Sequence, residues 1–402
     1  MTSDLRTQAL DMGEELRALR RELHQIPEIG LDLPRTQETV LAALDGLPLD
    51  ITTGTSLSSI TAVLRGGKPG GPIVLLRGDM DALPVVEKTG LPYTSRHENA
   101  MHACGHDLHT AGLVGAARLL SARREELPGD VVFMFQPGEE GAHGAEKMIE
   151  EGILTAAGRK ADAAYGLHVL SYRLPSGRFG TRPGTLMSAS DGLFVDVIGK
   201  GGHGAKPFLT RDPMPAACEM VLALQTMVTR RFNIFDPVLI TVGLITGGTK
   251  RNIIPDRVRF EATIRTYSPE NRVLVKELAE QVLTGIASAH GVRVEVRHDP
   301  EYPVLVNNET EAAFVAETAR EVFGDEHYGH EASPESPSED FSFVLNDVPG
   351  AFVFLGACDT DPDTAESNHS PLAVFDDAVV PDGAALLAEL AVRRLARQTP
   401  AH

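Results

Sequence analysis

Residues 72–84, PIVLLRGDMDALP, hold the pattern that decides the fold. A short apolar run ends in polar residues, among them Asp79 and Asp81. Three more runs share this apolar character, at 130–136, 163–169 and 351–357. Apolar runs of this length without alternation are typical of strands buried on both faces of a sheet. The pattern predicts a mainly parallel sheet whose strands end in polar loops.

Helical patterns separate these runs. Residues 12–26 carry apolar side chains at steps of three and four, and Pro27 follows. Residues 108–125 carry a second apolar face. Strands that alternate with helices predict an α/β sheet with helices on both sides, that is, an α/β/α sandwich.

The middle of the chain has a different order. The expected elements are a strand at 193–199, a helix at 213–231, strands at 238–246 and 257–267, a helix at 269–290 and a strand at 293–301. This is the β-α-β-β-α-β order of a ferredoxin-like α+β unit. We therefore expect a catalytic domain built from 1–188 and 303–402, with a smaller domain at 189–302 inserted into it.

Composition excludes several classes of protein. The net charge of −19 opposes binding to nucleic acid and anionic membranes. The chain has only three cysteines in 402 residues, so a disulfide framework is not expected. We find no secretory leader pattern and no apolar run long enough to span a membrane. These observations predict a cytoplasmic protein that acts on a small molecule.

Metal-binding side chains follow the predicted strands. The stretch MHACGHDLHT at 101–110 is one source, and QPGEEG at 136–141 is another. In open α/β sheets, ligands bind beyond the carboxyl ends of the strands. The residues expected to converge there are Cys104, His106, Glu139, Glu140, His168 and His369.

Thiolate, imidazole and carboxylate groups together suit zinc, manganese or cobalt. Without Glu139 the set has one group more than a closed tetrahedral site uses, so it fits two metals or one metal with open positions. Glu139 is then available as a general base. His102, His109 and His143 are interpreted as structural residues.

Other catalytic motifs have no support. GKGGHG at 199–204 satisfies a dinucleotide fingerprint, but Pro207 and Pro213 delay the helix that should follow it. The H-E-x-x-H and G-x-S-x-G motifs do not occur.

The sequence resembles the aminoacylase/carboxypeptidase family of metal amidohydrolases, and within it the hippurate hydrolases and indole-acetyl-amino-acid hydrolases. The matching motifs span nearly the whole chain: HQIPEIG, RGDMDALPV, HACGHDLHT, QPGEEG, GLHV, GKGGHGAKP, RNIIPD, IRTYSPENR, SEDFSF and HSP. The resemblance implies hydrolysis of N-acyl amino acids to a carboxylic acid and an amino acid. It also implies that the inserted domain is a lid and dimerisation domain, in a homodimer or alternatively a tetramer.

The resemblance also implies roles for individual residues. Cys104 would bridge two metal ions, and the other ligands would be His106, Glu140, His168 and His369. Zinc or manganese is expected, and cobalt or nickel also suit these ligands. Glu139 would be the base, supported by Asp81 behind the metal site. His203 would reach across the dimer to the oxyanion, while Asn252 and Arg265 would contact the substrate. Asn368 departs from the family pattern.

Three alternatives remain open at the level of sequence. One is a dipeptidase or carboxypeptidase of the same family, and another uses Cys104 as a nucleophile with His106 as its base. The third is a metal-free binding protein on the same fold. We also expect the inserted domain to close over the substrate by hinges near 186–190 and 300–304.

Overall fold

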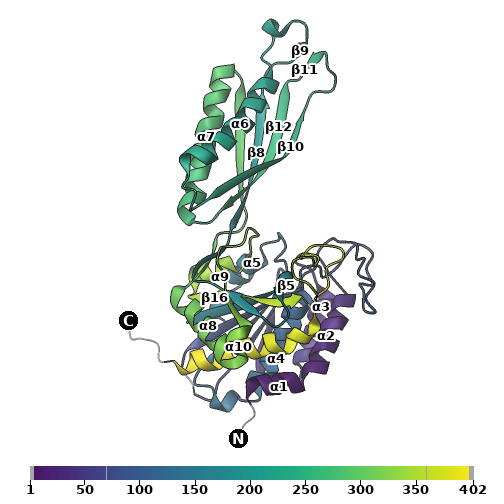
Figure 1. Ribbon diagram of the computed structural model, residues 1–402, viewed down its shortest axis with the longest axis vertical. Helices are drawn as coiled ribbons and strands as arrows, with labels where there is room; N and C mark the ends of the chain where they lie inside the picture. The colour runs from purple at the N-terminus through teal and green to yellow at the C-terminus, as the bar shows by residue number, and fades with distance from the viewer. Residues whose placement is uncertain (1–3, 69, 359, 398–402) are drawn as a thin grey trace. The chain divides into compact units, whose positions relative to one another are not determined.

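The structure is a computed structural model that describes residues 4–68, 70–358 and 360–397 (Figure 1). The chain divides into two compact units. Unit 1 comprises 1–186, 306–333 and 340–402, and unit 2 comprises 187–305 and 334–339. Each unit has its own sheet and its own hydrophobic core.

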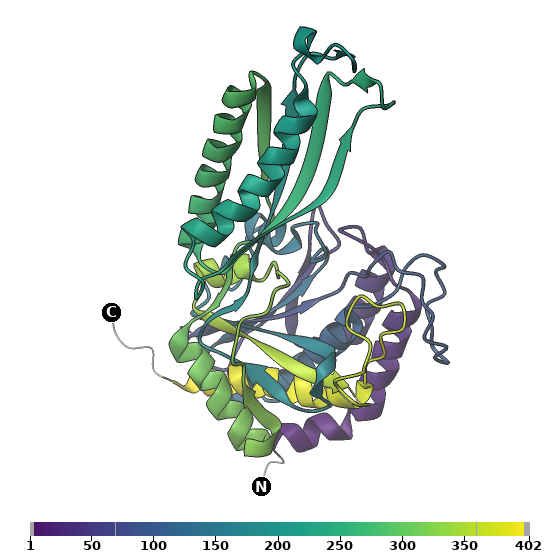
Figure 2. The ribbon, with the colours of Figure 1, turned by 45° about the horizontal axis from the view of Figure 1, so that its top comes forward.

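Unit 1 is built on a sheet that has eight strands within the described residues, in the order β1-β2-β4-β3-β5-β16-β6-β15. The strands are β1 (Leu49–Thr53), β2 (Ile60–Leu64), β3 (Ile73–Asp79), β4 (Asp130–Gln136), β5 (Ala163–Pro175), β6 (Phe179–Thr181), β15 (Tyr328–His330) and β16 (Gly350–Cys358). The neighbours β4, β3, β5 and β16 are parallel. Figure 2 shows β5 and β16 side by side, although they lie far apart in the sequence.

Burial explains why these strands show no alternation. Every residue of β3 and of β16 is buried, so both faces of each strand carry apolar side chains. The helices of unit 1 are α1 (Leu5–Asp11), α2 (Gly13–Gln25), α3 (Pro34–Leu44), α4 (His106–Ser121), α5 (Gly144–Glu150), α8 (Glu309–Phe323), α9 (Ser342–Asp347) and α10 (Val380–Ala396). The mixed α/β class predicted from the sequence is confirmed.

Helix α4 carries the predicted ligand His106 at its start. Its N-cap Gly105 has φ 87°, a left-handed conformation that glycine adopts without strain. The helix therefore begins at His106, two residues before the predicted start. Of its residues only Arg118 is not buried, so α4 is held by packing along nearly its whole surface.

Unit 2 follows the predicted β-α-β-β-α-β order. Its main elements are β8 (Ala189–Ile198), α6 (Pro213–Arg231), β10 (Val238–Gly247), β12 (Arg257–Thr266), α7 (Pro269–His290) and β13 (Arg293–Pro300). The sheet order is β10-β12-β8-β13 and all pairs are antiparallel. A small two-stranded antiparallel sheet pairs β9 (Gly202–His203) with β11 (Ile253–Ile254).

The predicted insert 189–302 lies inside the segment 187–305 of unit 2. The structure adds residues 334–339, which the sequence pattern assigned to a loop of the catalytic domain. The Ser188 amide donates hydrogen bonds to the carbonyl oxygens of Glu335 and Pro337, both at 3.1 Å. The remaining strands, β7 (Gly184–Met187) and β14 (Leu305–Asn307), lie where the chain passes between the units. No helix of the described residues has the length and apolar character to cross a membrane.

Candidate metal centre

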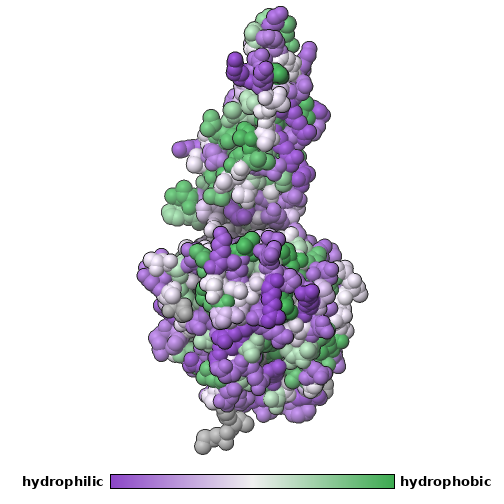
Figure 3. All heavy atoms as spheres, turned by 90° about the vertical axis from the view of Figure 1, so that its right-hand side faces the viewer, coloured by the Kyte–Doolittle hydropathy of each residue, from purple (hydrophilic) through white to green (hydrophobic). Residues whose placement is uncertain are grey.

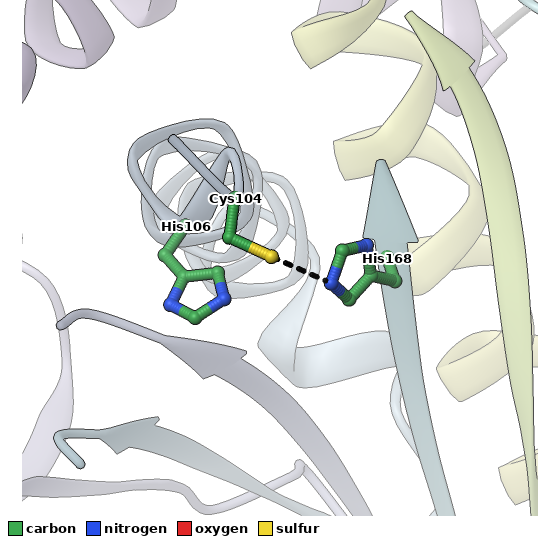
Figure 4. A group of neighbouring side chains, drawn as sticks. All are labelled: Cys104, His106 and His168. Carbon is green, nitrogen blue, oxygen red and sulfur yellow. Dashed lines mark hydrogen bonds between the residues drawn. The ribbon is translucent and has the colours of Figure 1, made fainter. Parts of the chain in front are cut away.

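The first group of possible ligands gathers at the start of α4. Cys104 lies just before the helix, His106 is its first residue, and His168 comes from β5. The Cys104 Sγ and the His168 Nε2 are 3.3 Å apart (Figure 4). Ligand atoms of Cys104, His106 and His168 all lie within 4.8 Å of one another. This spacing suits side chains that share one metal ion.

A second group shares Cys104 with the first. His369 Nε2 lies 3.3 Å from Cys104 Sγ and 3.1 Å from Glu140 Oε1. Ligand atoms of Cys104, Glu140 and His369 again lie within 4.8 Å of one another. The structure therefore brings all five residues predicted as ligands together. Cys104 belongs to both groups.

His168 lies inside a strand rather than at its end. The sequence pattern ended this strand at 169, but β5 continues to Pro175. The His168 Nδ1 donates a hydrogen bond to the Val169 carbonyl oxygen at 2.8 Å. This bond turns the Nε2 lone pair toward Cys104, as a metal ligand requires.

Asp81 supports the site through hydrogen bonds to three of its residues. Its two carboxylate oxygens accept hydrogen bonds from the backbone amides of Glu139 and Glu140, each at 3.0 Å. Its carbonyl oxygen accepts a hydrogen bond from His106 Nδ1 at 2.9 Å. Asp81 thus orients one imidazole and both glutamates, in keeping with the supporting position expected from the sequence.

One residue near the ligands was interpreted incompletely from the sequence. His109 was interpreted only as a structural residue, but its ring centroid lies 4.8 Å from that of His168. Its Nδ1 donates to Asp79 Oδ1 at 2.5 Å and its Nε2 accepts from the Val169 amide at 2.8 Å. Both nitrogens are occupied, so His109 orients the site and is not a ligand. The signal available in the sequence was the spacing of three residues between His106 and His109, on a helix that faces Asp79.

The charge distribution of the site suits a divalent cation. Hydrogen bonds with Cys104 and Glu140 raise the pKa of His369 to about 10. The thiolate and carboxylate that favour a proton there also favour a metal ion in its place. Burial, with the charge of His109, holds the pKa of His168 well below its usual range, which keeps that ring neutral. His106 Nε2 is buried and makes no hydrogen bond within the described residues. The residues present therefore fit a metal centre.

The backbone of His369 is strained. Its φ of 72° lies in the left-handed region, which residues with a side chain rarely adopt. The His369 amide donates a hydrogen bond to the Ala103 carbonyl oxygen at 2.8 Å, which ties it to the segment that carries Cys104. Strain of this kind is maintained where surrounding contacts fix a functional side chain.

The other predicted residues belong to unit 2. His203 is exposed on β9, where its Nδ1 accepts a hydrogen bond from the Ala205 amide at 3.0 Å. Asn252 lies beside it, since its carbonyl oxygen accepts the Gly204 amide at 2.9 Å. Arg265 lies elsewhere on the unit, on β12, and donates to Ser190 Oγ at 2.5 Å and Thr263 Oγ1 at 2.7 Å. The structure brings His203 and Asn252 together but does not bring Arg265 to them.

Comparisons with known proteins place these residues in context. The model of peptidase family M20/M25/M40 matches residues 75–393. The chain is 37% identical to the N-acetyl-L-cysteine deacetylase of Bacillus subtilis over 96% of this chain and 89% of that protein. It is 33% identical to the hippurate hydrolase of Campylobacter jejuni over 96% of this chain and 98% of that protein. A solved structure from Bacillus subtilis, described as a dinuclear metal binding peptidase, is 32% identical with a TM-score of 0.83, covering 96% of this chain and 98% of that one.

Proposed function

The chain belongs to peptidase family M20/M25/M40, and from this premise we propose that it hydrolyses the amide bond of N-acyl amino acids at a centre of two divalent metal ions in unit 1. The observation that carries the proposal is the pair of ligand groups that share Cys104. The relatives named a deacetylase and a hippurate hydrolase support an acyl amino acid as the substrate. The products are a carboxylic acid and a free amino acid.

Five side chains of unit 1 would hold the metals: Cys104, His106, Glu140, His168 and His369. When bound, such ions polarise the scissile carbonyl and lower the pKa of water toward about 7. Zinc or manganese suits this mixture of sulfur, nitrogen and oxygen, and so do cobalt and nickel.

Glu139 would be the general base. Its side chain is buried beside Glu140, and the bond from its amide to Asp81 fixes the backbone from which it extends. A carboxylate in this position takes a proton from the attacking water and then donates it to the nitrogen of the leaving amine. Both transfers use the same oxygen atoms, so one residue serves both halves of the hydrolysis.

Residues of unit 2 would complete the reaction. We assign His203 to stabilisation of the oxyanion, with Asn252 beside it in contact with the substrate. Arg265 would hold the substrate carboxylate, because a guanidinium can bind a carboxylate with two hydrogen bonds. In the conformation described, its donors are directed to hydroxyl groups of Ser190 and Thr263, which a substrate carboxylate would replace.

A homodimer formed through unit 2 is part of the proposal. The strand β10 lies at the edge of its sheet, and apolar side chains are exposed on β10 and α6 (Figure 3). These side chains are Leu222, Leu239, Leu244 and Ile245, with 44% to 69% of each exposed. An exposed edge strand with apolar neighbours is the kind of surface that pairs with a second copy. We further propose a cytoplasmic location, supported by three cysteines that are all free thiols.

The test is to remove metal with a chelator, reload zinc or manganese, and measure amine release from benzoyl-, acetyl- and long-acyl amino acids beside a set of dipeptides. We expect metal-restored hydrolysis of the acyl amino acids. Preference for dipeptides would select the dipeptidase alternative. Activity that is lost on alkylation but unaffected by chelators would instead identify Cys104 as a nucleophile and overturn the proposal.

A further inference from the structure

The side chain of Asn368, the residue before His369, makes several hydrogen bonds around the site. Its Oδ1 accepts a hydrogen bond from the Ser171 amide at 3.0 Å. The Ser171 hydroxyl lies at the same distance from Oδ1 and also donates to the Glu366 carbonyl oxygen at 2.8 Å. The Asn368 Nδ2 donates to the carbonyl oxygens of Val169 at 3.0 Å and Cys104 at 3.2 Å. The same Nδ2 lies 3.8 Å from Cys104 Sγ, within the range of a hydrogen bond to sulfur.

These partners fix the orientation of the amide. A backbone N–H can only donate, so the atom facing the Ser171 amide must be the oxygen. The two carbonyl oxygens can only accept, so the atom facing them must be the nitrogen. The side chain can therefore satisfy its partners in one orientation only. In that orientation one N–H points to the Val169 carbonyl oxygen, and the other is shared between the carbonyl oxygen and the sulfur of Cys104.

The contacts connect three segments that carry proposed ligands. Asn368 precedes His369, binds the backbone of Cys104, and shares the Val169 carbonyl oxygen with His168 Nδ1. It also anchors one side of the strained His369 backbone, whose other side is anchored on Ala103. A single side chain thus lies between Cys104, His168 and His369 without being able to serve as a strong ligand itself.

We propose that Asn368 is a positioning residue that places Cys104 and His369 for metal binding and donates a hydrogen bond to the Cys104 sulfur. This inference rests on the proposed role of Cys104 as a ligand. A hydrogen bond to a thiolate withdraws electron density from the sulfur, and supporting contacts of this kind set both the direction and the basicity of a ligand. Replacement of Asn368 should then weaken metal binding and change the electronic character of the sulfur–metal bond.

The test uses two variants and a matched control. Asn368→Ala removes every side-chain contact, and Asn368→Asp keeps the shape but turns an acceptor toward two carbonyl oxygens and the sulfur. Asn307→Asp is the control, because Asn307 also bonds through both ends of its amide, to Thr181, Arg182 and Phe352. None of the bonds given for Asn307 involves a proposed ligand.

Three quantities are measured on each protein: cobalt affinity by competition with a chelator, the sulfur-to-cobalt absorption band, and unfolding of the metal-free form. We expect both Asn368 variants to lose about 10- to 100-fold in affinity and to shift the band. The control should lose stability and keep both the affinity and the band. Wild-type affinity with an unchanged band in Asn368→Ala would overturn the inference, and so would an equal loss of affinity in the control.

A milder variant guards against misfolding. Ser171→Ala removes the hydroxyl that is shared between Asn368 Oδ1 and the Glu366 carbonyl oxygen, and it leaves the backbone bond to Oδ1 in place. We expect a smaller loss of affinity in the same direction, and no change would count against the inference. If the wild type itself shows no sulfur-to-cobalt band, the ligand role of Cys104 fails, and this inference fails with it.

Discussion

Glu139 and Glu140 are adjacent in the sequence but have different roles in the proposal, and substitution can separate them. Glu139→Gln keeps the size of the side chain and removes its ability to accept a proton. We expect kcat to fall by about 10²- to 10⁴-fold with the metal content unchanged. Glu140→Gln should instead lose metal, since its Oε1 lies among the proposed ligands. Steady-state kinetics with metal analysis of both proteins checks the difference, and metal loss in Glu139→Gln would contradict the assignment.

The buried imidazole of His24 makes stability depend on pH. Burial lowers its pKa, but the charge and hydrogen bond of Asp107, with the hydrogen bond of Glu87, outweigh burial and leave the pKa above its usual value. The folded state therefore binds this proton more tightly than the unfolded state does. The resulting stability is fully present below the unfolded pKa of about 6.5 and is lost as the pH rises through the folded pKa.

Comparison with His24→Gln tests this dependence. We expect the wild type's advantage in unfolding free energy to shrink as the pH rises above the unfolded pKa of about 6.5. Both proteins carry the same metal-binding residues, so titration of those residues cancels in the difference. An advantage that grows with pH would contradict the sign.

Part of the site followed from a single rule. The rule that ligands gather beyond strand ends predicts that Cys104, His106 and Glu140 lie near one another, and possible ligand atoms of each pair among them lie within 4.8 Å. The role of His109 could not be read in the same way, because it depends on which face of α4 meets Asp79. The contacts of Asn368 could not be predicted, because they depend on the left-handed backbone conformation of His369, which the residue pattern does not indicate.

At the scale of elements, the buried strand β3 contains a charged residue, Arg77, among mainly apolar strands. Arg77 is fully buried, and its guanidinium lies 2.7 Å from Asp79 Oδ2 and 3.2 Å from Asp340 Oδ1. Burial alone raises the pKa of Asp79, but the nearby charges, led by Arg77, hold it well below its usual range. Removal of the guanidinium would take the Arg77 charge away from two buried carboxylates, Asp79 and Asp340.

We therefore expect Arg77→Met to cost about 3–5 kcal/mol in unfolding free energy. Arg65→Met is the control, since Arg65 is half exposed and its partners Asp50 and Asp130 are also accessible. That change should cost less than about 1 kcal/mol. Urea denaturation of both proteins measures the costs, and similar values would show that the buried pair contributes no more than the surface pair.

Helix boundaries were predictable where the capping residues are local. α6 and α7 match their predicted ranges because Asp212 and Ser268 cap their first turns and a proline follows each cap. The end of β5 was not predictable, since its later residues, LSYRLP at 170–175, mix apolar and polar side chains. Their pairing depends on β16, which is remote in the sequence. The addition of 334–339 to unit 2 likewise rests on tertiary hydrogen bonds of Ser188.

At the scale of the molecule, a dimer in which His203 acts on its partner's substrate can be tested by mixing subunits. Glu139→Gln and His203→Ala should each be inactive alone. In a mixed dimer, one site combines an intact Glu139 with the intact His203 of the other subunit. Random mixing should then restore about a quarter of the wild-type activity.

The mixture also separates the alternatives. If His203 served the site of its own subunit, neither site in the mixed dimer would be complete, and mixing would restore nothing. A different affinity tag on each variant, with purification on one tag and detection of the other, confirms that subunits have exchanged. A charged substitution at the exposed edge, such as Leu244→Lys, should give monomers. These monomers should lose activity because no partner supplies His203 to the site.

The order of the strands in unit 1 has a consequence for how the chain is made. β16 lies between β5 and β6 in the sheet, yet it begins at Gly350, long after β5 ends at Pro175. At about 5–20 residues per second, the ribosome takes roughly 10 to 35 seconds to cover that distance. During this time unit 2 can fold, because its main sheet uses only strands from within 189–300. Meanwhile the edge of β5 that pairs with β16 has no partner strand. Nascent chains halted before Gly350 are therefore the form of this protein most exposed to chaperones and aggregation.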